Sequence, residues 1–147
     1  MPIIEEKVRI SAPVEKVFAF LANPDNWTEY VTSLTNVSDL SSRELSPGTT
    51  FSWEYRMLGV KLHGTGSITE YNPASSFAMR MEGTIPIAER YTLAAVGPET
   101  ELSVRVEYTM PGVVLEKIAN SSLVEKLNRR EADNVLAKVK IFCEELS

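Results

Sequence analysis

The 147-residue chain has few of the side chains on which most metal sites and nucleophilic sites depend. It contains one cysteine, Cys143, and one histidine, His63. A single cysteine excludes an internal disulfide and a cysteine-rich metal cluster, and a single histidine removes most zinc sites and most catalytic triads. We therefore expect no metal and no cofactor. We interpret His63 as a residue of the outer surface and Cys143 as a small packing or surface residue.

Basic charge and long apolar runs are also scarce. The sequence has 15 Lys and Arg residues against 20 Asp and Glu residues, which gives a formal net charge of -5. Nucleic-acid-binding proteins need a basic patch, so nucleic acid is not an expected partner. No apolar run is long enough to span a bilayer, and the first residues lack the basic and apolar regions of a secretory signal. The sequence predicts a cytoplasmic protein without stable membrane insertion, with a single domain over residues 1–147.

Large apolar side chains alternate with polar or charged ones through residues 51–108. Phe51 and Trp53 alternate with Ser52 and Glu54, and the same period of two recurs in residues 77–82 and 102–108. Successive side chains of a strand point to opposite sides, so each segment has an apolar face and a wet face. Gly and Pro turn signals separate the segments. This pattern predicts an antiparallel sheet.

Helical signals lie on both sides of these strands. A first strand over residues 4–10 is followed by two short helices, one starting at Pro13 and one at Asn23-Pro24, and then by an edge strand over 34–40. From residue 111 to 146 the period changes to 3.6, which indicates a long helix that begins near Ser122 after a shorter turn or helix. The expected order is one strand, two short helices, six strands and one long helix, which is an α+β fold.

Four motifs along the chain resemble those of the START-related polyketide cyclase/dehydrase superfamily, also called SRPBCC. They are Val-Arg-Ile-Ser-Ala-Pro-Val-Glu-Lys-Val-Phe at 8–18, Asn-Pro-Asp-Asn-Trp at 23–27, Pro-Gly-Thr at 47–49 and Ile-Thr-Glu-Tyr-Asn-Pro at 68–73. The resemblance covers essentially the whole chain. It implies a helix-grip fold, in which a curved antiparallel sheet of about seven strands wraps around the C-terminal helix and leaves a hydrophobic cavity. The superfamily includes lipid and sterol carriers, aromatase/cyclases, quinone-binding proteins and plant hormone receptors, so the fold alone does not select a function.

Residues on the inward face of the sheet and on the facing stripe of the helix are candidates for the cavity wall. Glu89 is in phase with Tyr91, and Asn128 and Glu131 interrupt the apolar stripe of the helix, where a solid core prefers Leu or Ile. We expect a pocket on the order of a few hundred Å³, with gaps in the sheet at two glycines, 64 and 66. The full set of cavity candidates is Phe51, Trp53, Tyr55, Met57, Phe77, Met79, Met81, Glu89, Tyr91, Tyr108, Val124, Asn128, Glu131 and Val135.

The sequence leaves three functions open. The aromatic and methionine-rich face and the scarcity of catalytic groups favour binding or transport of a hydrophobic or amphipathic small molecule, such as a lipid, a quinone, an aromatic compound or a polyketide-like metabolite. The alternative is a cyclase or dehydratase-type enzyme in which Glu89 or Glu131 acts with a tyrosine. A further alternative is a protein-interaction module that works through the loop around Ser41 to Pro47 or through the segment from Val113 to Ala119, where an exposed apolar patch would favour it. The sequence assigns no catalytic residue and identifies no protein partner.

Overall fold

The computed structural model describes residues 3–57, 59–109 and 121–145, with the backbone alone for residues 121–124. The N-terminal elements are strand β1 (Ile3–Ile10), helix α1 (Val14–Leu21), the short 3-10 helix η1 (Pro24–Asn26) and helix α2 (Trp27–Tyr30). The later elements are β2 (Leu34–Ser38), β3 (Thr50–Met57), β4 (Val60–Asn72), β5 (Ser76–Gly83), β6 (Ile87–Val96), β7 (Glu99–Tyr108) and helix α4 (Ser121–Glu145). The predicted order of elements is confirmed.

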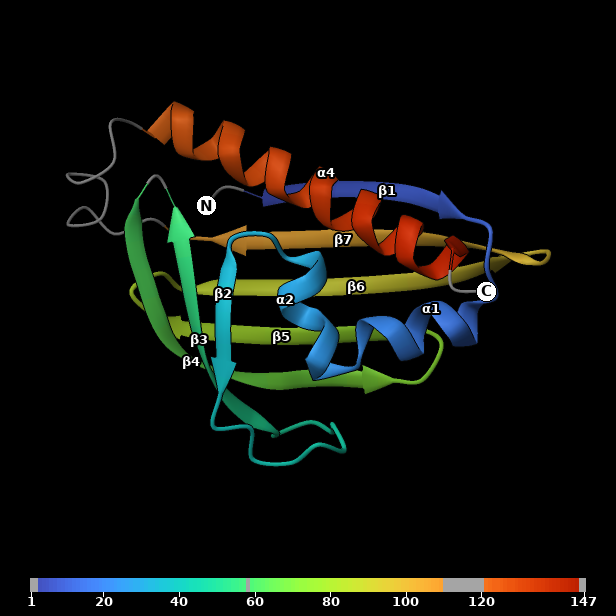
Figure 1. The fold of residues 1–147 in the computed structure, drawn as a ribbon, viewed down its shortest axis with the longest axis horizontal. Coiled ribbons are helices and arrows are strands. Elements are labelled where there is room, and N and C mark those ends of the chain that lie inside the picture. The colour runs from blue at the N-terminus through green and yellow to red at the C-terminus, as the bar shows by residue number, and fades with distance from the viewer. Residues whose placement is uncertain (1–2, 58, 110–120, 146–147) are drawn as a thin grey trace.

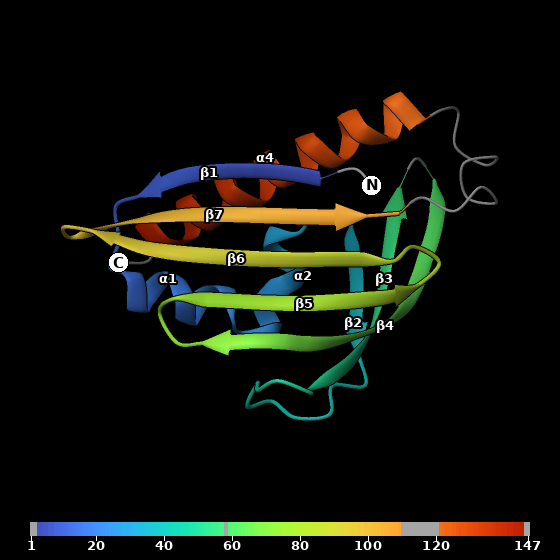
Figure 2. The same ribbon diagram turned by 180° about the vertical axis from the view of Figure 1, so that it is seen from behind.

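The strands form one antiparallel sheet in the order β1-β7-β6-β5-β4-β3-β2. Helices α1, α2 and α4 all lie on one side of this sheet, and the other side faces the viewer when the molecule is seen from behind (Figures 1 and 2). Strands β2 and β3 run across the direction of β5, β6 and β7, because β4 bends between the two groups (Figure 1). The predicted helix-grip fold, a curved seven-stranded sheet around a long C-terminal helix, is confirmed.

The bend of β4 depends on a β-bulge and on two glycines, 64 and 66. The pairing with β5 shifts register between Ile68 and Glu70, as in a β-bulge, which bends a strand. A Cβ atom on Gly64 would lie 1.8 Å from the carbonyl oxygen of Glu82, and one on Gly66 would lie 2.5 Å from the Phe51 ring. The expectation that these glycines leave gaps is therefore wrong, because a neighbouring backbone and an aromatic ring occupy the space above them.

The two short helices after β1 are held together by hydrogen bonds to one carbonyl group. The Trp27 indole NH and the Tyr30 hydroxyl both donate to the backbone oxygen of Leu21, over 3.0 and 2.9 Å. The Asn23 side chain accepts from the backbone NH of Asp25, which confirms the predicted cap. This arrangement carries the Tyr30 side chain into the core, where it is 1% exposed.

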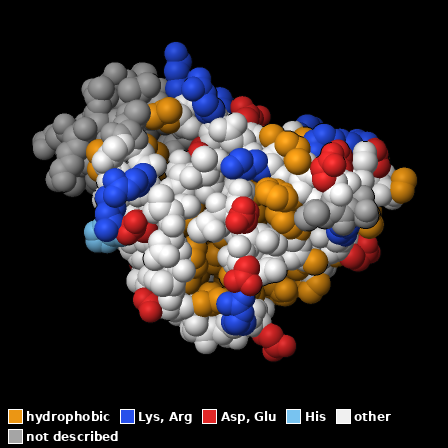
Figure 3. Space-filling view, in the orientation of Figure 1, with side chains coloured by type: hydrophobic (Ala, Val, Ile, Leu, Met, Phe, Trp, Pro, Cys, Tyr) orange, Lys and Arg blue, Asp and Glu red, His pale blue; other side chains and the backbone are white. Residues whose placement is uncertain are grey.

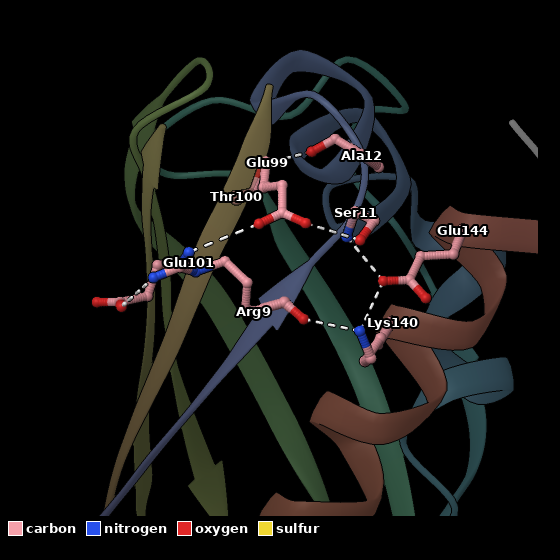
Figure 4. Close-up of polar contacts among 8 residues, drawn as sticks. All are labelled: Arg9, Ser11, Ala12, Glu99, Thr100, Glu101, Lys140 and Glu144. Atoms are coloured by element: carbon pink, nitrogen blue, oxygen red, sulfur yellow. Dashed lines mark hydrogen bonds and ion pairs between the residues drawn. The ribbon is translucent and has the colours of Figure 1, made fainter. Parts of the chain in front are cut away.

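Helix α4 is tied to the end of β1 by a polar network near its C-terminus (Figure 4). The Lys140 ammonium group donates to the carbonyl oxygen of Arg9 over 2.9 Å and forms an ion pair with Glu144 over 2.6 Å. Glu144 in turn accepts from the backbone NH of Ser11 over 2.7 Å. The bonds to Arg9 and Ser11 join residues more than 130 positions apart and fix the C-terminal half of the helix.

The inner side of α4 is apolar, as its period of 3.6 predicted. Among the described side chains of this helix, the buried ones are Ala132, Val135, Leu136, Val139 and Cys143. The predicted turn or helix between residues 113 and 119 lies outside the described residues, as do the side chains of the predicted cap at Ser122. Within the described ranges, no helix has both the length and the apolar character that crossing a membrane requires.

Candidate functional site

A partly enclosed cavity lies between the inner face of the sheet and α4. The volume open to the centres of water molecules is about 70 Å³, which is smaller than the pocket expected from the sequence. Large buried side chains such as Leu62, Ile85 and Val104 project into the space and reduce it. The lining residues are Val31, Ser33, Tyr55, Arg56, Met57, Leu62, Ile85, Ile87, Glu89, Val104, Val106, Tyr108, Asn128, Glu131, Ala132 and Val135.

A smaller chamber of about 20 Å³ adjoins this cavity on the side of α2. Its wall is largely aromatic and consists of Trp27, Tyr30, Val31, Leu34, Val37, Phe51, Trp53, Tyr55, Met79, Met81, Glu89 and Tyr91. Val31, Tyr55 and Glu89 line both spaces. The partition between the two chambers therefore includes a phenol and a carboxyl group.

Glu89 is the polar group at the centre of this arrangement. It pairs with Met79 of β5 and Val106 of β7, and its side chain accepts a hydrogen bond from the Tyr91 hydroxyl two residues along the same strand. The residue keeps partial exposure, yet burial is the main cause that raises the pKa of the Glu89 carboxyl above its ordinary value. The negative charge of Glu131 raises this pKa further. Glu89 therefore takes up a proton more readily than an exposed carboxyl does.

Three tyrosines surround this carboxyl. Burial raises the pKa values of Tyr30, Tyr55 and Tyr91 well above the ordinary value, and the negative charge of Glu89 raises them further. These phenols stay protonated and can donate hydrogen bonds. The Tyr30 hydroxyl donates a hydrogen bond to the backbone oxygen of Leu21. The Tyr55 hydroxyl has no hydrogen-bond partner within the described part of the chain.

Glu131 places a second carboxyl group in the cavity wall, on α4. Its two oxygens accept hydrogen bonds from Ser33, one from the backbone NH over 3.0 Å and one from the hydroxyl over 2.9 Å. These bonds join α4 to the connection between α2 and β2. Asn128, one turn earlier on the helix, and Tyr108, near the end of β7, also line the cavity. Neither has a side-chain hydrogen bond to another described residue.

The structure brings most of the predicted site residues to one or other chamber. The larger cavity has Tyr55, Met57, Glu89, Tyr108, Asn128, Glu131 and Val135, and the smaller one has Phe51, Trp53, Tyr55, Met79, Met81, Glu89 and Tyr91. Phe77 lines neither chamber, because its ring packs in the core near the rings of Trp27 and Tyr91, with centroids 6.2 and 6.3 Å away. The side chain of Val124 lies outside the described residues.

Several lining residues were missed by the sequence analysis. Leu62 and Val106 lie in strands whose alternation of side chains could have identified them. Ser33 and Ile85 lie between elements, where no periodicity marks an inward position. Only the folded chain shows that these two residues reach the cavity.

Neither His63 nor Cys143 lines either chamber. His63 is exposed on the outer face, as predicted. Cys143 is buried on α4, and burial raises the pKa of its thiol to about 11. Among the described residues, no three His, Cys, Asp or Glu side chains are grouped so that they could hold a metal ion.

Comparison with known proteins gives a family and a fold. The family model described as polyketide cyclase / dehydrase and lipid transport matches residues 1–141. A search of curated protein sequences gave no significant match.

Solved structures similar to this chain come from several bacteria. A protein from Thermus thermophilus has a TM-score of 0.80 and 18% identity, with 99% of each chain covered. The Zhui aromatase/cyclase from a Streptomyces species has a TM-score of 0.80 and 14% identity, with 98% of this chain and 94% of that chain covered. A START superfamily protein from Mycobacterium smegmatis has a TM-score of 0.77 and 12% identity, with 99% of each chain covered. At these identities the similarity shows the fold, whereas the family model matches nearly the whole sequence: the chain belongs to the polyketide cyclase / dehydrase and lipid transport family.

Proposed function

We propose that the protein binds a small, mainly apolar molecule in the cavity between the sheet and α4. The observation that supports this proposal is the wall of the cavity, in which apolar side chains from five elements surround a few polar ones. Small-molecule sites commonly combine an apolar wall with a small number of polar groups that fix the orientation of the ligand. The polar groups available for that purpose include those of Tyr55, Arg56, Glu89, Tyr108, Asn128 and Glu131.

The driving force for binding is burial of apolar surface, which contributes about 25 cal/mol per Å² removed from water. A cavity of about 70 Å³ admits only a small ligand or part of a larger one unless side chains move. Met57 and Tyr55 are the side chains best placed to move, since both line the cavity and neither is fully buried. Methionine adapts easily to different shapes, and rotation of Tyr55 would join the two chambers.

The family and the similar structures support the class of ligand. The family description includes polyketide cyclases and lipid transport, and one of the similar structures is an aromatase/cyclase. A lipid, a quinone, an aromatic compound or a polyketide-like metabolite fits these descriptions and an apolar wall. On the face covered by the helices, acidic and basic side chains are interspersed (Figure 3), in keeping with a small-molecule ligand rather than nucleic acid. The cytoplasmic location stays a prediction.

A matched pair of helix variants tests whether the cavity is the binding site. Ala132 of α4 is buried in the cavity wall, whereas Ala137 of the same helix is exposed. Ala132→Leu adds three carbon atoms inside the cavity, and Ala137→Leu adds the same atoms outside it. Binding is measured with N-phenyl-1-naphthylamine, a neutral apolar dye whose fluorescence rises away from water. Native mass spectrometry of the freshly purified protein, followed by solvent extraction, identifies any molecule that co-purifies.

We expect Ala132→Leu to weaken dye binding by at least about tenfold, which corresponds to about 1.4 kcal/mol. Ala137→Leu should bind the dye as the unchanged protein does. If a folded Ala132→Leu variant binds the dye with unchanged affinity, the ligand does not occupy this cavity and the proposal is wrong.

Enzymatic activity is the second candidate, and the Glu89–Tyr91 pair favours it. A carboxyl with a raised pKa that is hydrogen-bonded to a phenol inside a cavity is a common arrangement for general acid–base catalysis. In a cyclisation or dehydration, Glu89 would exchange a proton with the ligand while a tyrosine donates a hydrogen bond to a carbonyl oxygen. Glu89→Gln should then abolish turnover of a poly-β-keto substrate without preventing its binding. Turnover at an unchanged rate by this variant would exclude the role.

The third function left open by the sequence was a protein-interaction module. The segment from Val113 to Ala119 lies outside the described residues. In the loop around Ser41 to Pro47, the large apolar side chain, Leu45, is buried, so this loop gives no support to that alternative.

A further inference from the structure

Two carboxyl groups from opposite sides line the larger cavity, and no basic side chain among the described residues pairs with either. Glu89 belongs to the sheet and Glu131 belongs to α4. The ion pairs formed among the described residues involve other acidic side chains. Arg56 lies in the cavity wall, but its positive charge acts on Glu54 of the outer face. Both carboxyl groups of the cavity wall therefore lack a paired cation among the described residues.

The hydrogen-bond partners of these carboxyls are neutral groups. Glu131 accepts from the backbone and hydroxyl of Ser33, and Glu89 accepts from the Tyr91 hydroxyl through one of its oxygens. The second oxygen of Glu89 has no hydrogen-bond partner among the described residues. A neutral donor eases the burial of a carboxylate but does not cancel its charge, and buried charges in proteins are normally paired with an opposite charge.

A third polar group in the same wall points to a ligand independently of the two carboxyls. Tyr108 lines the cavity and is only 4% exposed, and its hydroxyl has no hydrogen-bond partner within the described ranges. The hydroxyl oxygen is not among the fully buried atoms that lack a partner, so it is accessible from the open space of the cavity, although the rest of the side chain is buried. A ligand group in the cavity can supply the missing partner.

We propose that the cavity selects apolar molecules that carry a protonated amine, and that it discriminates against carboxylates of the same shape. This inference rests on the proposed function and names the ligand class for that site. An ammonium group placed between Glu89 and Glu131 supplies the positive charge that both carboxyls lack and offers three hydrogen-bond donors. A carboxylate at the same place meets two acidic side chains, neither of which is paired with a cation among the described residues.

Binding of an amine also displaces a proton from the site. The groups that face Glu89 are Tyr91 on its own strand, Tyr55 from β3, Tyr30 from α2 and Glu131 from α4. Burial and the negative charge of Glu131 favour the protonated form of Glu89 when no ligand is bound, and the hydrogen bond from Tyr91 opposes them without reversing the rise of the Glu89 pKa. An ammonium ion favours the carboxylate instead. Amine binding therefore releases a proton, and the affinity for the amine rises with pH through the range in which Glu89 titrates.

Three ligands with one skeleton test the proposal on the unchanged protein. They are 2-phenylethylamine, 2-phenylethanol and phenylacetate, which are respectively cationic, neutral and anionic at about pH 7. Isothermal titration calorimetry at low salt gives the affinities, and repeating it in buffers of different ionisation enthalpy gives the number of protons released. We expect the amine to bind at least about tenfold more tightly than the alcohol, phenylacetate to bind most weakly, and a fraction of a proton to be released with the amine alone.

Two variants test whether the preference for the amine depends on Glu89. Glu89→Gln should reduce the preference for the amine over the alcohol to less than about threefold and abolish proton release. Glu82→Gln, an exposed position on the neighbouring strand β5, should leave the preference unchanged.

The outcomes separate this inference from the proposed function. If the alcohol binds in the cavity and the amine binds no more tightly, the charge selectivity is wrong and the cavity remains a binding site. If phenylacetate binds most tightly, the sign of the selectivity is reversed and the inference fails. If none of the three ligands and no neutral apolar dye binds, both the inference and the proposed function are overturned.

Discussion

Replacing Glu89 by glutamine should change the stability of the protein in a way that depends on pH. Glutamine has nearly the same shape, and its amide oxygen can still accept the hydrogen bond from Tyr91, but it has no charge to bury. The ordinary pKa of glutamate is 4.5, and in the folded protein the pKa of Glu89 is higher. As pH rises past the ordinary value, the unfolded chain releases its proton first. The folded state therefore loses stability until pH has passed its own, raised pKa.

The change in stability with pH has an upper limit, because only one proton is gained or lost. One group can change the free energy of unfolding by at most about 1.4 kcal/mol per pH unit, and each unit by which the folded pKa is raised costs about 1.4 kcal/mol above that pKa. The Glu89→Gln variant does not lose this free energy of unfolding. Relative to the unchanged protein, it should gain stability as pH rises above about 4.5, and the gain should level off once Glu89 is ionised in both states.

Glu54→Gln provides a control in which the expected sign is reversed. Glu54 lies on the outer face of β3, where hydrogen bonds from Lys61 and Thr35 lower its pKa below the ordinary value. A lowered pKa stabilises the folded state at neutral pH, and this contribution is lost as pH falls through the folded pKa. The Glu54→Gln variant should therefore be less stable than the unchanged protein at neutral pH, and the two should become equal in acid.

Urea unfolding at a series of pH values measures both variants, with the free energy of unfolding taken by linear extrapolation. The result that would refute the reasoning is a difference between Glu89→Gln and the unchanged protein that stays constant, or falls, as pH rises above about 4.5. That outcome would mean that the Glu89 carboxyl is solvated and that burial and Glu131 do not raise its pKa.

Two further predictions concern buried groups outside the cavity. Thr100→Val removes the hydrogen bond from the fully buried Thr100 hydroxyl to the carbonyl oxygen of Ala12, 2.8 Å away (Figure 4), and should lower the free energy of unfolding by about 1–3 kcal/mol in urea titrations. Thr92→Val, at an exposed strand position, should change it by less than about 0.5 kcal/mol, and equal effects of the two substitutions would contradict the role of this bond. The pKa of the Cys143 thiol is raised from 9.0 to about 11, so near neutral pH it should have about a hundredfold less thiolate than an ordinary cysteine. Iodoacetamide should therefore modify Cys143 slowly in the native protein and rapidly in urea. Rapid modification of the native protein would show that Cys143 is accessible and ionised.

Much of the fold could be predicted because its local signals agree with one another. The alternation from Phe51 to Met57 corresponds to β3, and the Asn23-Pro24 signal corresponds to the capped restart before α2. The contacts of Gly64 and Gly66 could not be predicted. They depend on the carbonyl group of Glu82 and on the ring of Phe51, which reach the glycines only when the sheet has curved.

The sequence could predict which side chains face the cavity, but not how packing divides the space between the sheet and α4. The alternation of side chains along the strand predicted that Glu89 faces inward. The polar position in the apolar stripe of the helix indicated Glu131. Both residues line the cavity. The division into two chambers, with Tyr55 in the partition, depends on side-chain packing that no periodicity records. The hydrogen bonds from Ser33 to Glu131 join positions 98 residues apart, so no local pattern reveals them.

The central claim is that a ligand occupies the space between the sheet and α4, and the methionine methyl groups report on it most directly. Met57 lines the larger cavity, and Met79 and Met81 line the smaller chamber. The measurement is a carbon–proton NMR titration of protein labelled with ¹³C at the methionine methyls, with signals assigned by Met→Leu variants and N-phenyl-1-naphthylamine as ligand. The account predicts saturable shifts and ligand–methyl Overhauser effects at Met57. Saturable binding of the dye with no change at any of these three methyls would contradict it.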